Sequence, residues 1–197
     1  MKIALMGPPN SGKSKLARAI AQELDIKSVV GYVDLIQKNS ELALGGSATY
    51  WENFMVAGTR LAKEVSVGPG VDYVVAGTIV DTLCYAMVKA DVVLNTSPQE
   101  DQRVAQAAQD AIRGLTTIYS QTWNYDLTFF LPYTRTQRKR REPWERVLEV
   151  VYADVIQAYG VPEVAILEGS STQKFQTAMA EILTYEEDLV GENEETD

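Results

Sequence analysis

A glycine-rich loop of the pattern G-x-x-x-x-G-K-[ST] occupies residues 7–14 of this chain, where the sequence reads Gly-Pro-Pro-Asn-Ser-Gly-Lys-Ser. It follows a short apolar run, 2–6, and precedes a stretch of helical period, 14–24. A strand, a glycine turn and a helix start in this order form an anion site, because the helix offers free N–H groups and the positive end of its dipole. The sequence therefore predicts a phosphate-binding loop (P-loop) at the start of an α/β fold.

Each position of the loop has a physical reason. Pro8 and Pro9 have no N–H to donate, so the amides that follow them must form the cradle. Asn10 tolerates a positive φ if the loop requires one. Lys13 brings a point charge to the β and γ phosphates, and Ser14 offers its hydroxyl to Mg²⁺. The predicted nucleotide-binding residues are Asn10, Ser11, Gly12, Lys13 and Ser14.

The composition narrows the remaining chemistry. The chain has 197 residues, of which 46% are hydrophobic, and this suits one compact domain with a real core. It has no apolar run of the roughly 20 residues that a membrane span needs, and we expect a soluble, cytoplasmic protein. One cysteine, Cys84, and no histidine exclude an intramolecular disulfide, His-based catalytic triads and multi-cysteine or His-ligated metal sites.

Short apolar runs alternate with helical patterns along the chain. Helices are predicted at 14–24, 50–67, 99–115, 143–159 and 172–185, and strands at 2–6, 26–33, 72–77, 126–131 and 163–167. The segment 90–95 is compatible with an edge strand or a buried loop and stays unassigned. Such an order predicts an α/β fold, with a five-stranded, mostly parallel sheet that has helices on both faces and binds ligands at the carboxyl ends of its strands.

The charges divide the chain into a domain, 1–185, and an acidic tail, 186–197. The tail holds seven acids and no base, and we expect it to be disordered. The net charge of −9 argues against general binding to nucleic acid, although a local basic patch lies between Arg135 and Arg146, with six bases against two acids.

The basic patch follows the fourth predicted strand, where an arginine-bearing lid could close over a triphosphate. Its candidate catalytic residues are Arg135, Arg138 and Arg141, which are spaced at three and would share one helical face. A solvated charged surface and a nucleic-acid patch remain alternatives to the lid.

Phosphoryl transfer also needs carboxylates, one to hold Mg²⁺ and one to accept a proton. Asp34 follows the second predicted strand and is our candidate for catalysis and metal binding, whereas Asp81 follows the third strand and either meets substrate or caps a helix. Arg60 and Tyr85 are further candidates for substrate binding. Glu64, on the same predicted helix as Arg60, is expected on its solvated face.

Other P-loop classes lack their signatures here. A regulatory GTPase needs an Asn/Thr-Lys-x-Asp guanine reader, which the chain does not contain. Residues 42–47, Leu-Ala-Leu-Gly-Gly-Ser, only superficially match the signature of a transporter-type ATPase, and the length leaves little room for the extra domain of a ring-forming ATPase. A compact kinase is the class that remains.

Four stretches then resemble the P-loop nucleoside and nucleotide kinase group: the loop 7–14, the helix end Gly-Thr-Arg-Leu-Ala-Lys-Glu at 58–64, the strand and turn 74–85, and 125–132 with the arginines beyond it. Thr-Ile-Val-Asp-Thr-Leu-Cys-Tyr at 78–85 is similar to deoxynucleoside and thymidylate kinases, and 131–182 is similar to the kinase domain that phosphorylates nicotinamide riboside. The resemblance implies ATP and Mg²⁺ as cofactors, a nucleoside or nucleotide substrate, and an adenine site near Gly169 and Ser170.

One departure from that group affects the chemistry. Where those families carry an acid and an arginine after the third strand, this chain has Ala76-Gly77, which shifts the metal and base roles to Asp34 or Asp81. The leading hypothesis is an ATP- and Mg²⁺-dependent nucleoside or nucleoside monophosphate kinase. A kinase of another small hydroxyl compound, of the nicotinamide riboside or shikimate type, and a slow NTP-binding regulatory protein remain alternatives, and a homodimer stays open.

Overall fold

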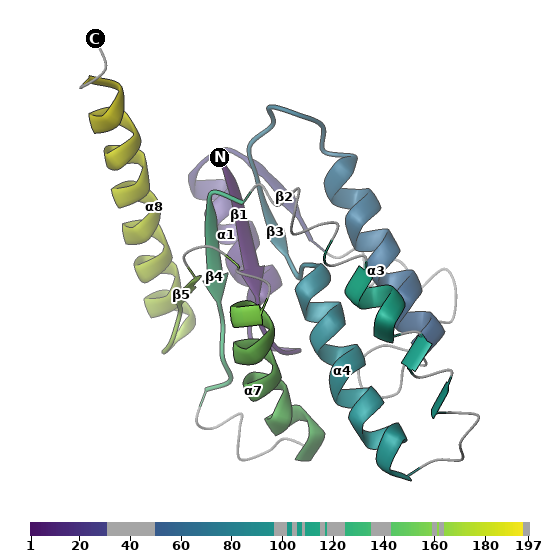
Figure 1. Cartoon of the computed structure of the whole chain (residues 1–197). Helices are drawn as coiled ribbons and strands as arrows, with labels where there is room; N and C mark the ends of the chain where they lie inside the picture. Colours follow the sequence, from purple (N-terminus) through teal and green to yellow (C-terminus); the bar gives the residue numbers. More distant parts are fainter. Residues whose placement is uncertain are drawn as a thin grey trace.

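The structure is a computed structural model of the chain, shown in Figure 1. It describes residues 1–30, 50–96, 102–103, 106–107, 109–114, 117, 125–134, 143–158, 161 and 164–194. Asp34 and the three lid arginines lie outside these ranges, so their predicted roles stay predictions. None of the helices in the described ranges is long and apolar enough to cross a membrane.

Five strands form one sheet in the order β2-β3-β1-β4-β5. Every neighbouring pair is parallel, which confirms the predicted α/β sheet. The strands are β1 Lys2–Met6, β2 Lys27–Val29, β3 Tyr73–Ala76, β4 Leu127–Phe130 and β5 Val164–Ile166. Because β1 is the central strand, the loop that follows it opens at the middle of the sheet's carboxyl edge.

Helices cover both faces of the sheet, as predicted (Figure 1). Side chains alternate along β1, so that Ile3 and Leu5 face one core and Met6 faces the other. The first core is closed by α1, Lys13–Glu23, and α8, Ser171–Glu194, and the second by α4, Ile79–Thr96, and α7, Pro143–Ala158. The remaining long helix, α3, Tyr50–Val65, packs against α4.

Two segments differ from the sequence prediction. Residues 90–95 are the last turns of α4, neither an edge strand nor a loop, because a short apolar run does not by itself distinguish a strand from a buried helix. The closing helix does not end at Tyr185 but continues to Glu194, through most of the acidic segment that we expected to be disordered. Glutamate is a good helix former, and no proline interrupts this segment.

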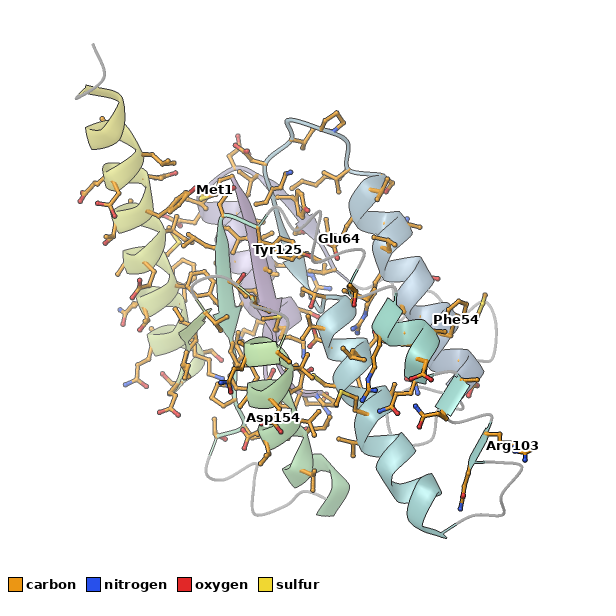
Figure 2. All side chains as sticks on the ribbon, viewed as in Figure 1. Met1, Phe54, Glu64, Arg103, Tyr125 and Asp154 are labelled. Carbon is orange, nitrogen blue, oxygen red and sulfur yellow. The ribbon has the colours of Figure 1, made fainter. Side chains whose placement is uncertain are left out.

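Glu64 corrects another expectation, since it is buried and does not lie on a solvated face. Its Oε2 accepts a hydrogen bond from the hydroxyl of Tyr125, which lies 61 residues further along the chain (Figure 2). Glu64 also lies near Tyr73, the first residue of β3, and the pKa of the Tyr73 hydroxyl is raised by burial and by the Glu64 carboxylate. The hydrogen bond between Tyr125 and Glu64 joins the last turn of α3 to the segment just before β4, two residues ahead of Leu127.

Replacing Tyr125 with Phe should therefore destabilise the fold. The change takes a donor from a buried carboxylate, and we expect the free energy of unfolding to fall by about 1–3 kcal/mol in urea denaturation. Adding Glu64→Gln to that variant removes the buried charge and should recover part of the loss. An unchanged urea midpoint in the Tyr125→Phe variant would contradict this role for the pair.

Candidate functional site

The P-loop lies between the ends of two neighbouring strands. The N–H of Gly77, after β3, donates to the Leu5 carbonyl at 3.0 Å, and the N–H of Leu131, after β4, donates to the Met6 carbonyl at 2.9 Å. The segments that follow β3 and β4 therefore flank the loop on both sides. Ligands bind at this place in an open parallel sheet, where the strand order changes direction.

Three positive φ angles shape the loop. Gly7 has φ 143°, and a Cβ there would lie 2.4 Å from the Leu131 carbonyl oxygen, so only glycine fits against β4. Asn10 has φ 59°, so the loop does require the positive φ that this residue type was expected to tolerate. Gly12 has φ 103°, and a Cβ there would meet nothing within 4 Å, so the space beside this peptide is open.

The amides after Gly12 point to an anion site. The first hydrogen bond of α1 runs from the Leu16 N–H to the Gly12 carbonyl at 3.0 Å, and no side chain caps this helix at Gly12. The N–H groups of Lys13 and Ser14 precede that bond, as the first amides of a helix do. Amides at this place in a helix can donate to a phosphate, and Ser14, which is exposed, lies beside them.

The Lys13 ammonium folds back onto its own loop. It donates to the Gly7 carbonyl and, at 2.8 Å, to the Pro8 carbonyl, and it lies 3.7 Å from Oδ1 of Asp81. Burial lowers the pKa of Lys13 to about 8, although the Asp81 carboxylate acts in the opposite direction and the Arg60 and Lys174 charges add to the lowering. A polyphosphate would supply the anionic partner that this ammonium lacks within the loop.

The Asp81 carboxylate is fully buried beneath the P-loop and already bound on both oxygens. Oδ1 accepts from the Gly7 N–H at 3.0 Å and from the Tyr152 hydroxyl at 2.7 Å. Oδ2 accepts from the Thr78 N–H at 2.6 Å and from the Thr78 hydroxyl at 3.2 Å. Asp81 is thus the third residue of α4 rather than its N-cap, and it binds back to Thr78 as in a capping box.

Two other predicted substrate-binding residues lie close to this carboxylate. Arg60, on α3, is buried and donates through Nη1 to the Thr78 carbonyl at 2.5 Å and to the Thr82 hydroxyl at 2.8 Å. Tyr85 lies one turn after Asp81 on α4 and is only partly exposed, and its pKa is raised by burial and by the Asp81 charge. The predicted set of Arg60, Asp81 and Tyr85 is therefore brought together on the α4 side of the P-loop.

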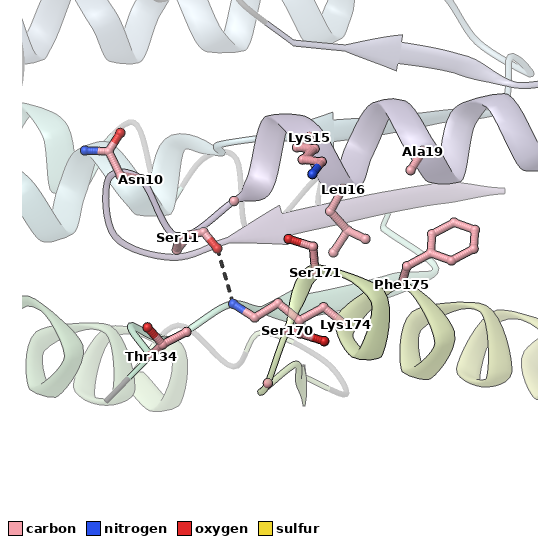
Figure 3. Close-up of a pocket in the computed structure, with 12 residues that line it drawn as sticks. Asn10, Ser11, Lys15, Leu16, Ala19, Thr134, Ser170, Ser171, Lys174 and Phe175 are labelled. Atoms are coloured by element: carbon pink, nitrogen blue, oxygen red, sulfur yellow. Dashed lines mark hydrogen bonds between the residues drawn. The ribbon is translucent and has the colours of Figure 1, made fainter. Parts of the chain in front are cut away.

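A cavity of about 340 Å³ opens on the opposite side, between α1 and the start of α8 (Figure 3). Asn10, Ser11 and Gly12 line it from the loop, and Gly169 and Ser170 line it from the segment after β5. The Ser170 hydroxyl accepts from the Gln173 N–H at 3.3 Å, while Oε1 of Gln173 accepts from the Ser170 N–H at 2.8 Å. This capping box fixes the start of α8 beside the P-loop.

Sequence reasoning missed two residues of the site. Tyr152, on α7, is fully buried and reaches both Asp81 and, at 2.9 Å, the Gly7 carbonyl oxygen. Lys174, on α8, is 5% exposed and donates to the Ser11 carbonyl at 3.2 Å. A lysine one turn after the predicted adenine segment was a usable signal for Lys174, whereas Tyr152 fits the apolar period of its helix and gave none.

No family model matches the chain, and neither does any curated protein sequence. Several solved structures superpose on this chain, and they share one fold. The NadR protein in complex with NAD and AMP-PNP superposes with TM-score 0.70 at 14% identity, over 93% of this chain and 49% of that one. The chain thus spans about half the length of NadR.

Thymidylate kinase from Candida albicans gives TM-score 0.65 at 14% identity, over 94% of this chain and 92% of that one. Deoxyadenosine kinase from M. mycoides, with dCTP bound, gives 0.63 at 13%, over 93% and 100%. The chain therefore has the fold of the P-loop nucleoside and nucleotide kinases, as the sequence resemblance predicted.

The lowered pKa of Lys13 leads to a prediction about pH. In the protein without ligand the pKa of Lys13 is about 8, and a bound phosphate would raise it. The affinity for ADP should therefore be highest below pH 8, where Lys13 is charged, and should fall as the pH rises through 8. The loss should approach roughly tenfold per pH unit until the bound pKa is reached. Calorimetric titration of ADP between pH 7 and pH 10 measures this slope.

Lys13→Arg is the matched control for the slope, because its guanidinium stays charged over the whole range. Its affinity, whatever its size, should not change with pH above 8. A parent protein whose ADP affinity is equally flat would contradict the assigned role of the ammonium.

Proposed function

We propose that the chain is an ATP- and Mg²⁺-dependent kinase that transfers the γ-phosphate to a nucleoside or a (deoxy)nucleoside monophosphate. The observation that carries this proposal is the P-loop itself, whose open peptide at Gly12, uncapped helix start and buried Lys13 ammonium lie together at the end of the central strand. The likeness in fold to thymidylate and deoxyadenosine kinases supports it.

The described residues fit the donor nucleotide. The amides at the start of α1 and the Lys13 ammonium would hold the β and γ phosphates, and the cavity beside Gly169 and Ser170 has room for the nucleoside. The Ser14 hydroxyl would be one ligand of Mg²⁺, which supplies charge neutralisation between the phosphates. The described ranges contain no group of three or more acidic, cysteine or histidine side chains that could hold a metal. We therefore propose Asp34, which lies outside these ranges, as the carboxylate ligand of Mg²⁺.

The acceptor would lie on the α4 side. Arg60 places a buried positive charge there, and Tyr85 offers a partly exposed ring on which a base could stack. In this proposal Asp81 does not contact the substrate, although such a contact is one of the two roles expected from its place in the sequence. Because donors already occupy both of its oxygens, it positions Gly7 and Lys13 instead of taking the acceptor's proton. The arginines at 135, 138 and 141 would close over the phosphates.

One second candidate has a specific observation in its favour. NadR superposes on this chain also as its complex with NR, with TM-score 0.68. A kinase for nicotinamide riboside, which is likewise a nucleoside with a free hydroxyl, is therefore our alternative acceptor assignment.

A phosphorylation screen tests the proposal. The purified chain is incubated with ATP and Mg²⁺ and with deoxynucleosides, their monophosphates, nicotinamide riboside or shikimate, and products are separated by mass. We expect one nucleoside-type acceptor to be phosphorylated and Lys13→Met to lose on the order of 10²-fold or more in turnover. ATP binding without any acceptor in the panel would favour a regulatory NTP-binding protein.

The two acids should behave differently when each is replaced by Asn. Asp34→Asn should reduce turnover on the order of 10²-fold with an unchanged melting temperature, as a lost metal or base carboxylate does. Asp81→Asn places an amide NH₂ against donors beneath the P-loop, and it should lower the free energy of unfolding by about 1–3 kcal/mol as well as the activity. Thermal melts and initial rates on both variants check this, and a stable, inactive Asp81→Asn would reverse the two roles.

A further inference from the structure

Lys174 is a buried cation at the back of the P-loop. Lysine is almost never fully buried unless it is paired, yet this side chain is only 5% exposed. The capping box at Ser170 fixes the first turn of α8, and Lys174 extends from that turn toward the loop (Figure 3). Its Nζ donates to the Ser11 carbonyl oxygen at 3.2 Å, across 163 residues of sequence.

The acceptor of that bond belongs to a particular peptide group. The Ser11 carbonyl and the Gly12 N–H are the two ends of one planar amide. A cation on the oxygen draws electron density from the amide and makes its N–H a stronger donor, as in any chain of polarised hydrogen bonds. The position that a Cβ of Gly12 would take, next to this amide, is open.

The ammonium also adds to the electrostatic potential of the cradle. The charge of Lys174 is near enough to the Lys13 ammonium to contribute to lowering the pKa of that group. Burial lowers the pKa of Lys174 itself, and the Glu168 carboxylate partly opposes this. Two largely buried cations, Lys13 from α1 and Lys174 from α8, thus both donate to carbonyl groups of the P-loop.

We propose that Lys174 is a positioning residue of the phosphate site: it fixes and polarises the Ser11–Gly12 peptide so that the Gly12 N–H binds the nucleotide's phosphates. The inference rests on the proposed function, since it assumes that the loop binds a polyphosphate. It assigns to α8 a part in phosphate binding beyond its contribution to the wall of the cavity.

Binding of inorganic pyrophosphate tests the inference, because this probe has no base or ribose to contact the cavity. Calorimetric titration at fixed pH compares the parent with Lys174→Gln, which can still donate to the carbonyl but has no charge, and with Lys174→Arg, which keeps the charge. We expect Lys174→Gln to lose on the order of tenfold in affinity and Lys174→Arg to stay within about threefold of the parent. Arg18→Gln, an exposed charge on α1 outside the cavity, controls for net charge and should stay within about twofold.

The outcomes separate the two proposals. A folded parent that binds no pyrophosphate overturns the proposed function and this inference with it. A parent that binds, with Lys174→Gln binding equally well, overturns the inference alone. Urea unfolding of each empty variant accompanies the titrations, and Lys174→Arg keeps the inference testable if Lys174→Gln does not fold, because an Arg variant that folds but loses more than tenfold contradicts it.

Discussion

The buried carboxylate of Asp81 is the contact on which the geometry of the site depends. It accepts hydrogen bonds from the loop after β1, from the residue just before α4 and from the hydroxyl of Tyr152 on α7. Its negative charge also lies 3.7 Å from the Lys13 ammonium. Burying a carboxylate is costly unless donors replace water, and here four hydrogen bonds do so. Gly7 lies 74 residues before Asp81, so this hydrogen bond makes the shape of the loop after β1 depend on the position of α4.

The charge around the loop differs from the charge of the chain. The net charge is −9, yet Lys13, Arg60 and Lys174 are all largely or fully buried on the two sides of the P-loop. Burial is the largest cause of the lowered pKa of Lys13, and the Arg60 and Lys174 charges add to it, so the charged ammonium carries a free-energy cost in the empty protein. A bound polyanion offsets that cost, so the same groups that weaken the empty loop favour a phosphate ligand.

Local patterns predicted the strands and the P-loop because each is formed by residues close in sequence, although the strands pair over long separations, as Lys2 does with Tyr73. Strand β1 was placed at its observed bounds, and Asn10, whose residue type tolerates a positive φ, adopts one. The roles of Glu64, Tyr152 and Lys174 were missed because each depends on a partner 61 or more residues away. On an amphipathic helix, the local sequence around a glutamate or a tyrosine does not show whether its polar group is exposed to water or forms a buried hydrogen bond. The positions of Asp34 and the lid arginines stay predictions.

The turn from β3 into α4 determines where the acid beneath the P-loop lies. Strand β3 ends at Ala76, and Gly77 follows it with φ 86°. The Gly77 N–H donates to the Leu5 carbonyl, and α4 begins two residues later, at Ile79. The nearest acid, Asp81, consequently lies one helical turn further on and points under the loop, where its oxygens meet N–H and O–H donors. An acid held this way can orient Lys13 but has no lone pair left for a metal. This division of roles is why we propose a separate carboxylate, Asp34, for Mg²⁺, and why this site should depend on two acids with distinct tasks.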